Sequence, residues 1–343
     1  MRFLIDYHHS DLFESHYLLL EPLGIEVWRP IGMEWFHDGI WQFEKEWHGD
    51  AIAKQYLDIW DSDLITDNVV YRDDVTHPGR TFRMCTLDMA RDMEWDAVIS
   101  SLPANDDGLS HFAQEAGAKF GIHIGNEAQY SKWNLADFAL VSSYLNYTPK
   151  VPHVVYHQPF DLDVFRHDWP PSERSIASFI QCFAENQKPY AGFIELARSM
   201  PEYDWKVYGN YGSHAEDEFA CGNLSPVAEV AQKMRDSRVI WHAKSWGDGY
   251  GHVIHNAFAV GRPVVGNRRY YMGKMAEPLW VHGETSFDLS RMSPSELRTT
   301  LRALIEDDDY HRTISINAAA RFREVVDFDG ERDQVAEMLM GVL

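Results

Sequence analysis

The clearest chemical signal in this sequence is a glycine-rich stretch at residues 247–265, GDGYGHVIHNAFAVGRPVV. Gly249 and Gly251 precede a run with helical spacing, and without a Cβ atom each lets a ligand approach the backbone. The first turn of the following helix would present unpaired N–H groups and the positive end of its dipole to a phosphate group. The stretch therefore predicts either a phosphate-binding turn or a tight turn with a purely structural role, because a lone GxG pattern fits both.

Polar side chains flank this turn. Asp248 precedes the expected helix, and Asn256 lies about two turns into it. The packing stripe of the helix is formed by Val253, Ala257 and Val260. His252 and Asn256 fall on a different face from that stripe, so Asp248 and Asn256 are spaced to reach one ligand.

Strand-like and helix-like stretches alternate on both sides of the turn, which predicts parallel sheets with helices on both faces. The expected strands of the first half are 2–7, 25–28, 96–100, 119–124, 138–142 and 151–156, and its expected helices are 12–20 and 109–115. The expected strands of the second half are 176–183, 205–208, 239–241 and 263–265, and its expected helices are 189–198, 226–235 and one that begins near 251. Ser293 and Glu296 form a capping box with Pro294 at the first helical position, and two more helical stretches follow.

The length and the punctuation of the chain predict two domains. A single hydrophobic core seldom grows to serve 343 residues. The proline-containing stretch 168–172 separates an expected first domain, 1–165, from a second, 166–343. Residues 33–80 lose the alternation and are interpreted as an insertion in the first domain. Its tryptophans, Trp35, Trp41, Trp47 and Trp60, are expected either to fill a core or to stack on sugar rings.

Composition limits the classes of partner. The formal net charge is −22, from 53 acidic and 31 basic residues, so phosphate backbones and anionic lipids are disfavoured as ligands. No apolar run reaches the ~20 residues of a membrane span, and the opening residues lack the apolar region of a signal peptide. Cys85, Cys182 and Cys221 show no metal-ligand spacing and are expected to be buried thiols. We therefore expect a cytoplasmic protein without a membrane span.

Several common catalytic patterns are missing from the sequence. It has no HExxH, GxSxG or GxxxxGK[ST] motif, which excludes the zinc protease, serine hydrolase and P-loop classes. The 17 histidines show no helical ligand spacing with carboxylates, so no metal is expected.

The glycine-rich stretch resembles the donor-site signature of the retaining GT-B glycosyltransferases of family 4. That signature runs Glu-Gly-Phe-Gly, four residues, Glu-Ala-Met-Ala, one residue, Gly, one residue, Pro-Val-Val. Tyr250 stands in the Phe position, and Asp248 and Asn256 replace the two glutamates that face the donor sugar and the ribose. Asp248 keeps the charge on a shorter stem, and Asn256 can hydrogen-bond a ribose without charge. The matching residues are Gly249, Gly251, Ala257, Ala259, Gly261, Pro263, Val264 and Val265.

Three further segments carry the resemblance, which covers about 154–325. Residues 154–165 are similar to the family's inter-domain segment, and residues 208–212, with Gly209, resemble the loop that passes the nucleotide base. Residues 180–190 resemble the segment in which a lysine, here Lys188, neutralises the donor diphosphate. Gln181 stands where the family usually has an arginine, so Lys244 or Arg268 is expected to compensate. The opening of the chain and the insertion look instead like bacteriophage-encoded glycosyltransferases.

Histidines at the ends of expected strands are further candidates. His123 ends the strand 119–124, where members of the family often carry a site histidine, and His242 follows the strand 239–241. His8 and His9 follow the first strand. Strand carboxyl ends line the ligand crevice in such folds, so each histidine is expected either to be structural or to contact substrate.

The resemblance implies an α/β fold of the GT-B type, with two facing Rossmann-like domains and an interdomain cleft. It implies a metal-independent, retaining transfer of a hexose or pentose from a UDP- or GDP-linked donor to a hydroxyl acceptor. Lys188 and the N–H groups near Gly251 would stabilise the leaving diphosphate, and Asp248 would hold the sugar. His123, with His8 or His9, would position donor or acceptor. The donor-binding residues are expected to be Gly209, Lys244, Gly249, Tyr250, Gly251, His252 and Asn256, and the catalytic residues His123, Lys188 and Asp248.

Two other functions stay open from the sequence. The altered acidic positions also fit a non-catalytic protein of the same fold that binds nucleotide sugars or glycans. A phage enzyme that glycosylates a hydroxymethylated DNA base or a virion protein is a further alternative, although the net charge disfavours DNA.

Overall fold

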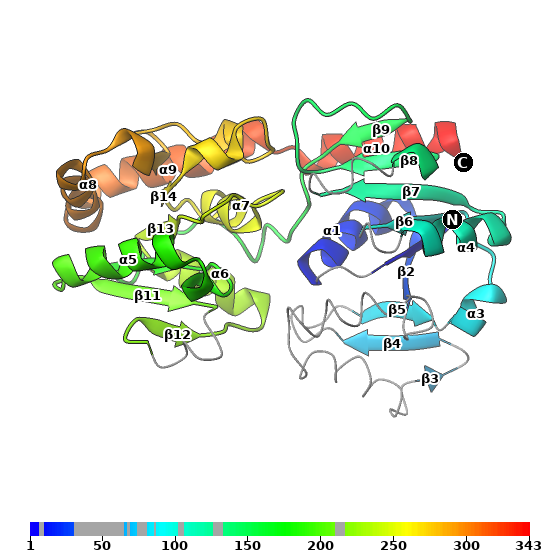
Figure 1. The fold of residues 1–343 in the computed structure, drawn as a ribbon, viewed down its shortest axis with the longest axis horizontal. Coiled ribbons are helices and arrows are strands. Elements are labelled where there is room, and N and C mark those ends of the chain that lie inside the picture. Colours follow the sequence, from blue (N-terminus) through cyan, green and yellow to red (C-terminus); the bar gives the residue numbers. More distant parts are fainter. Residues whose placement is uncertain are drawn as a thin grey trace. The chain divides into compact units, whose positions relative to one another are not determined.

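The computed structural model describes residues 1–6, 10–30, 65–66, 69–73, 81–85, 87–101, 106–125, 133–209 and 217–343. The chain forms two compact units, Met1–Phe160 with Phe328–Leu343, and Asp161–Asp327. Each unit is a sheet with helices, as the alternating pattern predicted (Figure 1). His8, His9, residues 210–212 and the four tryptophans of the predicted insertion lie outside the described residues.

The described part of the first unit contains one sheet with the strand order β3-β4-β5-β2-β1-β6-β7-β8-β9. Pairs from β5 to β9 are parallel, whereas β4 pairs antiparallel with both β3 and β5. Because β3 and β4 come from the predicted insertion, that segment extends one edge of the sheet. The strands are β1 (Arg2–Ile5), β2 (Glu26–Pro30), β3 (Ile65–Thr66), β4 (Val69–Asp73), β5 (Thr81–Cys85), β6 (Ala97–Ser100), β7 (Lys119–Ile124), β8 (Phe138–Val141) and β9 (His153–Val155).

Side chains alternate between the two faces of this sheet. Phe3 and Ile5 join a core cluster with residues of α1 and α10, whereas Leu4 joins a second cluster with residues of α3 and α4. The sheet is therefore covered by helices on both faces. The helical segments of this unit are α1 (Ser10–Leu20), η1 (Glu21–Leu23), α3 (Leu87–Arg91), α4 (Asp106–Ala116), η4 (Trp133–Leu135) and α10 (Phe328–Val342).

The last helix belongs to the first unit, whereas the boundary expected at residue 165 left it in the second. Val335 and Leu339 of α10 are buried in the cluster that contains Phe3, and α10 contacts β9 and α1 (Figure 1). Glu331 also accepts a hydrogen bond from the His157 backbone N–H at 2.7 Å, and its other oxygen lies 2.6 Å from His157 Nδ1. The physical reason is burial, because α10 covers an apolar face of the first sheet.

The second unit contains a six-stranded sheet of order β12-β11-β10-β13-β14-β15, counted over its described residues. All of its pairs are parallel. Its strands are β10 (Ser175–Ser178), β11 (Asp204–Tyr208), β12 (Ala220–Gly222), β13 (Val239–His242), β14 (Val264–Gly266) and β15 (Ser286–Asp288). Its helical segments are η5 (Phe183–Glu185), α5 (Gln187–Ser199), α6 (Val227–Asp236), α7 (His252–Ala259), η7 (Arg268–Tyr271), η8 (Glu277–Leu279), η9 (Leu289–Arg291), α8 (Pro294–Glu306) and α9 (Asp308–Val325).

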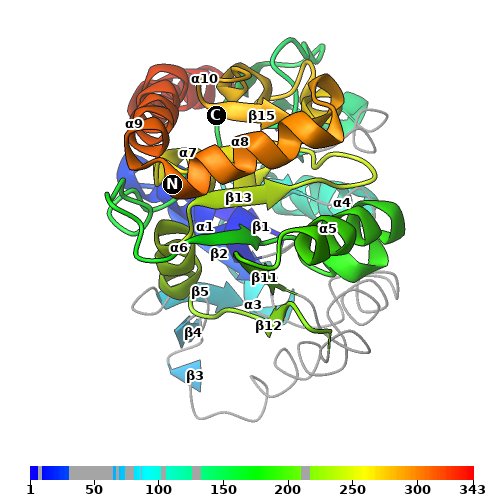
Figure 2. The same cartoon turned by 90° about the vertical axis from the view of Figure 1, so that its left-hand side faces the viewer.

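Helices also pack on both faces of this sheet. Trp241 and Val265 share a core cluster with residues of α5 and α8 (Figure 2). Ile240 and Val264 alternate with them and point to the other face, where α7 contacts β13 and β14. The parallel pairing places the carboxyl ends of β10, β11, β13 and β14 at one edge of the sheet.

The capping box predicted at the start of α8 is confirmed. Ser293 Oγ accepts a hydrogen bond from Glu296 N at 3.3 Å, and Glu296 Oε2 accepts one from Ser293 N at 2.8 Å. The prediction for the cysteines holds only in part, because Cys85 is buried but Cys182 is half-buried and Cys221 is exposed. Across the described residues, no helix combines the length and apolar character needed to cross a membrane.

Candidate functional site

The loop between β13 and α7, residues 243–251, lies at the carboxyl edge of the second sheet and is anchored on both sides. Ser245 N donates to Asn186 Oδ1 at 3.4 Å, which ties the loop to the start of α5. On the other side, a Cβ atom added to Gly247 would lie only 2.6 Å from the carbonyl oxygen of Tyr270. The loop therefore packs between the start of α5 and the segment that follows β14.

Asp248 is the centre of a hydrogen-bond network in this loop. His242 Nε2 lies 2.9 Å from Asp248 Oδ2, and the Tyr271 hydroxyl donates to the same oxygen at 3.1 Å. Lys244 Nζ pairs with Asp248 Oδ1. Lys274 Nζ donates to the backbone carbonyl of Asp248 at 2.8 Å. Four side chains thus hold one residue, two from the end of β13 and the loop after it and two from the segment that follows β14.

The charges of this network follow from its burial and its pairing. Burial raises the pKa of Asp248, but the charge of Lys244 and the hydrogen bond from His242 outweigh it and hold that pKa well below its usual range. Burial lowers the pKa of His242, although Asp248 opposes the shift. Burial and the Asp248 charge raise the pKa of Tyr271. At neutral pH the network therefore contains an ionised carboxylate, a neutral imidazole and a protonated phenol.

A neutral His242 that donates from Nε2 leaves Nδ1 as an acceptor. This atom is buried and has no hydrogen-bond partner among the described residues. The His242 imidazole therefore hydrogen-bonds Asp248 through Nε2, and its Nδ1 makes no hydrogen bond to the described residues.

The start of α7 has the features that the sequence predicted for an anion site. Gly251 is its N-cap with φ +86°, a left-handed conformation that favours glycine, and no side chain caps the helix. The first turn carries no acidic residue. Asn256 Oδ1, further along α7, is buried without a hydrogen-bond partner within the described part of the chain.

Tyr250 lies in the interior and not at the surface of this turn. Its ring is 4% exposed and stacks on His255 with centroids 4.0 Å apart and an interplanar angle of 6°. His252 meets the same ring edge-on at 4.9 Å. Tyr250 and His252 thus support the fold of the turn, while Gly249 is half-buried beside them.

Basic residues outnumber acidic ones around this site, although the whole chain carries −22. Between residues 239 and 276 Asp248 is the only acidic residue. Lys188 adds an exposed ammonium on the first turn of α5, two residues after the asparagine that binds the loop, and no described acidic residue pairs with it. Arg268 is paired with Glu277 at 2.7 Å. The basic residues that follow β13 and β14 in this range are Lys244, Arg268, Arg269 and Lys274, whereas Arg262 precedes β14 and is buried against the carbonyl oxygens of Asp168 and Arg235.

The structure brings together most of the candidates from the second half. His242 ends β13, Lys244, Asp248 and the glycines lie in the loop after it, and Gly209 follows β11 at the same edge of the sheet. A Cβ atom on Gly209 would lie 2.8 Å from Gln181 Oε1. Tyr271 and Lys274 were missed by the sequence analysis. They are remote from Asp248 in sequence and reach it only because β14 pairs with β13.

His123 belongs to the first unit and is fully buried there. Its Nε2 lies 2.8 Å from Ser142 Oγ, and its ring meets that of His16 edge-on at 4.8 Å. Gln158 Nε2 donates to the same serine hydroxyl at 2.6 Å. His123 is therefore surrounded by protein groups at the end of β7.

His16 makes folding stability depend on pH. Burial lowers the pKa of His16 to about 3 from its usual 6.5, so the folded state keeps this ring neutral. Its contribution is complete above pH 6.5 and is lost by about 1.4 kcal/mol per pH unit as the pH falls toward 3. We expect His16→Gln to flatten this dependence in urea unfolding between pH 4.5 and 7.5. His111→Gln is the control, because that side chain is 71% exposed. An unchanged pH dependence in His16→Gln would contradict the assignment.

The anchored loop leaves no room for a side chain at Gly247. We expect Gly247→Ala to lower the free energy of unfolding by about 1–3 kcal/mol, because the new Cβ meets the Tyr270 backbone. Gly192→Ala is the matched control: a Cβ there meets nothing within 4 Å, and alanine favours the helix α5 by about 0.5–1 kcal/mol. Thermal unfolding of both variants should show opposite shifts, and equal midpoints would disprove the close packing.

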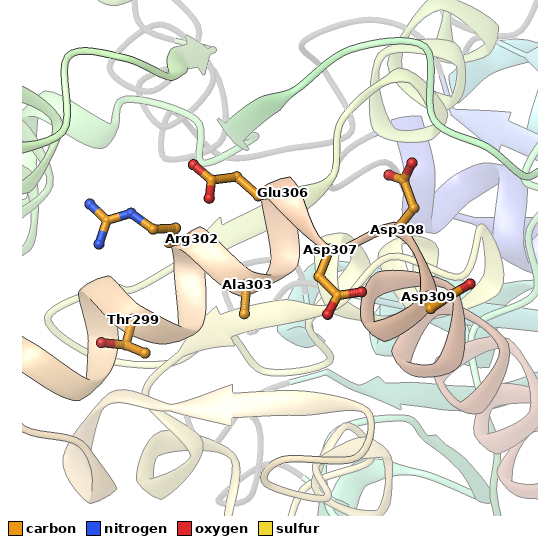
Figure 3. Close-up of a pocket in the computed structure, with 7 residues that line it drawn as sticks. All are labelled: Thr299, Arg302, Ala303, Glu306, Asp307, Asp308 and Asp309. Atoms are coloured by element: carbon orange, nitrogen blue, oxygen red, sulfur yellow. The ribbon is translucent and has the colours of Figure 1, made fainter.

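A surface pocket of the second unit lies elsewhere, at the junction of α8 and α9 (Figure 3). Asp307 Oδ1 caps α9 by accepting from Tyr310 N at 2.9 Å, and Asp308 Oδ1 pairs with Arg238 at 2.5 Å. Arg238 immediately precedes β13, so this pocket lies at the amino end of the strand whose carboxyl end leads to Asp248. Its acidic lining disfavours an anionic ligand. The lining residues are Thr299, Arg302, Ala303, Glu306, Asp307, Asp308 and Asp309.

Two α/β units of this kind in one chain fit the GT-B fold that the sequence predicted, and similarity to solved structures with this fold confirms it. The chain is similar to HepE of Anabaena, solved in complex with UDP and glucose, with 14% identity, a TM-score of 0.66, and coverage of 99% of this chain and 100% of that one. It is also similar to sucrose-phosphate synthase of Thermosynechococcus elongatus, with 10% identity, a TM-score of 0.66, and coverage of 99% and 98%. TarM matches with 7% identity, a TM-score of 0.66, and coverage of 98% of each chain. No family model and no curated protein sequence matches the chain.

Proposed function

We propose that this protein is a glycosyltransferase whose nucleotide-sugar donor binds at the carboxyl edge of the second sheet. The observation that carries the proposal is the uncapped, glycine-led start of α7, in a segment where four basic residues follow β13 and β14 although the whole protein is acidic. A helix start and nearby ammonium groups are suited to a diphosphate. The similar structures add support, since HepE was solved with UDP, with UDP and glucose, and with UDP-glucose.

The proposed chemistry is a retaining transfer like that of family 4. The bond from the anomeric carbon to the donor phosphate oxygen breaks, and a bond to the acceptor oxygen forms on the same face of the sugar. The proton of the acceptor hydroxyl passes to the leaving phosphate oxygen. Lys188 and the N–H groups at the start of α7 stabilise the charge that develops on the diphosphate. These groups neutralise the leaving group, so the proposed mechanism assigns no step to a metal.

Asp248 acts in this proposal as a preorganised contact for the donor sugar. A carboxylate has about four acceptor positions, and three of them serve Lys244, His242 and Tyr271. The remaining position is available for one sugar hydroxyl. The hydrogen bonds from the protein hold the carboxylate in one orientation, which limits the entropy lost when the sugar binds. Asn256 would hydrogen-bond the ribose through its side-chain amide, provided that ligand binding uncovers the Oδ1 atom that is buried in this structure.

A second candidate is a non-catalytic binder of nucleotide sugars with the same fold. The engagement of Asp248 by three side chains favours it, because a carboxylate already occupied by protein groups offers less to a substrate. Binding and turnover measurements distinguish the two candidates.

The test is incubation of the protein with a panel of UDP- and GDP-linked sugars, followed by mass spectrometry of the products. We expect release of one nucleoside diphosphate with transfer or hydrolysis of its sugar. Tight nucleotide binding without any turnover would instead establish the non-catalytic binder. If no nucleotide sugar binds or reacts, the proposed function is wrong.

A further inference from the structure

Trp246 is an exposed aromatic side chain on the anchored loop. Its side chain is 72% exposed, although large aromatic rings usually gain stability by burial. The residues on both sides are held, Ser245 by its hydrogen bond to Asn186 and Gly247 by its close approach to Tyr270. The backbone on both sides of Trp246 is thus anchored, while the indole meets solvent.

The neighbours of Trp246 indicate what could cover it. Lys244 and Asp248 lie two residues away on either side, and their mutual pairing leaves Lys244 with two further N–H donors. The segment after β14, which packs on Gly247, adds the exposed residues Arg269 and Met272. An aromatic face beside several hydrogen-bonding groups suits a sugar ring, which has an apolar C–H face and a rim of hydroxyls.

A protein partner fits this surface less well. The centre of a protein interface is a continuous apolar patch with few charges. Here the exposed large apolar side chains of the loops after β13 and β14 are Trp246 and Met272, and the same loops carry Lys244, Asp248, Arg268, Arg269 and Lys274. Among the described residues of the second unit, the other exposed large apolar ones are Leu162 and Ile316, which lie outside these two loops.

A nucleobase can also stack on a tryptophan ring, but the base of the donor nucleotide is expected to lie away from Trp246. The diphosphate and the ribose separate the base from the transferred sugar. Asp248, proposed to hold that sugar, is only two residues from Trp246. The donor sugar itself is joined to the phosphates at the start of α7, so the solvent-facing indole is open to a second molecule.

We propose that Trp246 is the platform of an acceptor subsite and that the acceptor is a saccharide whose pyranose ring stacks on the indole. Lys244 and Arg269 hydrogen-bond the hydroxyls at the rim of that ring. The inference rests on the proposed function and narrows it, because it assigns the acceptor to the glycans and excludes DNA bases and unglycosylated protein.

The test is an array of bacterial and plant glycans incubated with the labelled full-length protein in the presence of saturating UDP. We expect wild type to bind a defined set of glycans. We expect Trp246→Ala to bind that set about tenfold more weakly, which corresponds to about 1.4 kcal/mol. Trp246→Phe keeps an aromatic face and should lose less. Met340→Ala is the control, an exposed apolar residue of the first unit that should bind like wild type.

Calorimetry with UDP and GDP separates the two proposals. If wild type binds neither nucleotide, the proposed function fails, whatever the glycan result. If Trp246→Ala keeps nucleotide affinity but loses glycan binding, the saccharide platform is supported. Equal glycan binding by wild type and Trp246→Ala overturns the platform, as does binding to no glycan at all. A tenfold loss of UDP affinity in Trp246→Ala with unchanged glycan binding overturns it in favour of base stacking.

Discussion

Asp248→Ala is expected to lower kcat/KM for the donor by about 100- to 1,000-fold, because the ordered contact for the sugar is lost together with its supports. The same change removes the acceptor shared by His242, Lys244 and Tyr271. His242 Nε2 and the Tyr271 hydroxyl lie 2.9 Å apart and can still pair with each other, so the Lys244 ammonium is the group left unpaired, which costs about 1–3 kcal/mol of folding free energy. Steady-state kinetics and urea unfolding measure the two effects separately.

Two further variants separate the loss of the sugar contact from a general effect of replacing an aspartate. Asp248→Asn retains an acceptor oxygen for His242 and Tyr271, so it should keep more stability than alanine while still losing activity. Asp163→Ala, an exposed aspartate of the same unit, should change neither quantity. Full turnover in Asp248→Ala would place the reaction elsewhere in the molecule.

The lowered pKa of Asp248 gives this comparison a pH signature. A carboxylate whose folded pKa lies below the unfolded value stabilises the fold above the unfolded pKa, and that contribution disappears as the pH falls further. The difference in stability between wild type and Asp248→Ala should therefore be full above about pH 4 and shrink below it.

Lys188→Ala is expected to weaken UDP binding by about 10- to 100-fold, because one charge-assisted hydrogen bond to phosphate contributes about 1.5–3 kcal/mol. Uridine has no phosphate, so its affinity should not change. The stability of the fold should also stay the same, since no described acidic residue pairs with this exposed lysine. Calorimetric titration with UDP and uridine measures the contrast.

Lys119→Ala is the matched control for Lys188. Lys119 is also a lysine near the surface, but it lies in the first unit and pairs with Asp137 at 3.4 Å. Its replacement should leave UDP affinity unchanged. The UDP affinity of Lys188→Ala should also depend less steeply on salt than that of wild type, because one ion pair with the diphosphate is gone. Equal affinities of wild type and Lys188→Ala for UDP would remove Lys188 from the site.

The hydrogen-bond network around Asp248 gives a new reason for the aspartate that stands where the resembled family has glutamate. From sequence, aspartate in place of glutamate meant a shorter reach toward the sugar. In the structure the shorter carboxylate is hydrogen-bonded to His242, at the end of β13, and to Tyr271, in η7 of the segment that follows β14. The substitution therefore accompanies a rigid support behind the carboxylate, which a pairwise comparison of residue types does not reveal.

The local structure of this protein was predictable from its sequence. The capping box at Ser293, the strand over β7 and the glycine-led start of α7 depend on residues within about four positions of one another. Interactions over that range decide caps, turns and the direction of side chains from a helix or strand. The glycine-rich turn was found for the same reason.

Tertiary structure decided which distant residues contact Asp248 in the turn and which domain the last helix joins. Tyr271 and Lys274 reach Asp248 because β14 lies beside β13, and α10 joins the first unit because its apolar face covers that sheet. Full burial of His123 likewise depends on His16 and Ser142, which are remote in sequence. Such contacts follow from strand order and burial, and these depend on the whole chain at once. The sequence by itself thus determined the glycine-rich turn before α7, and the packing of distant segments determined the charge and rigidity of the candidate site around it.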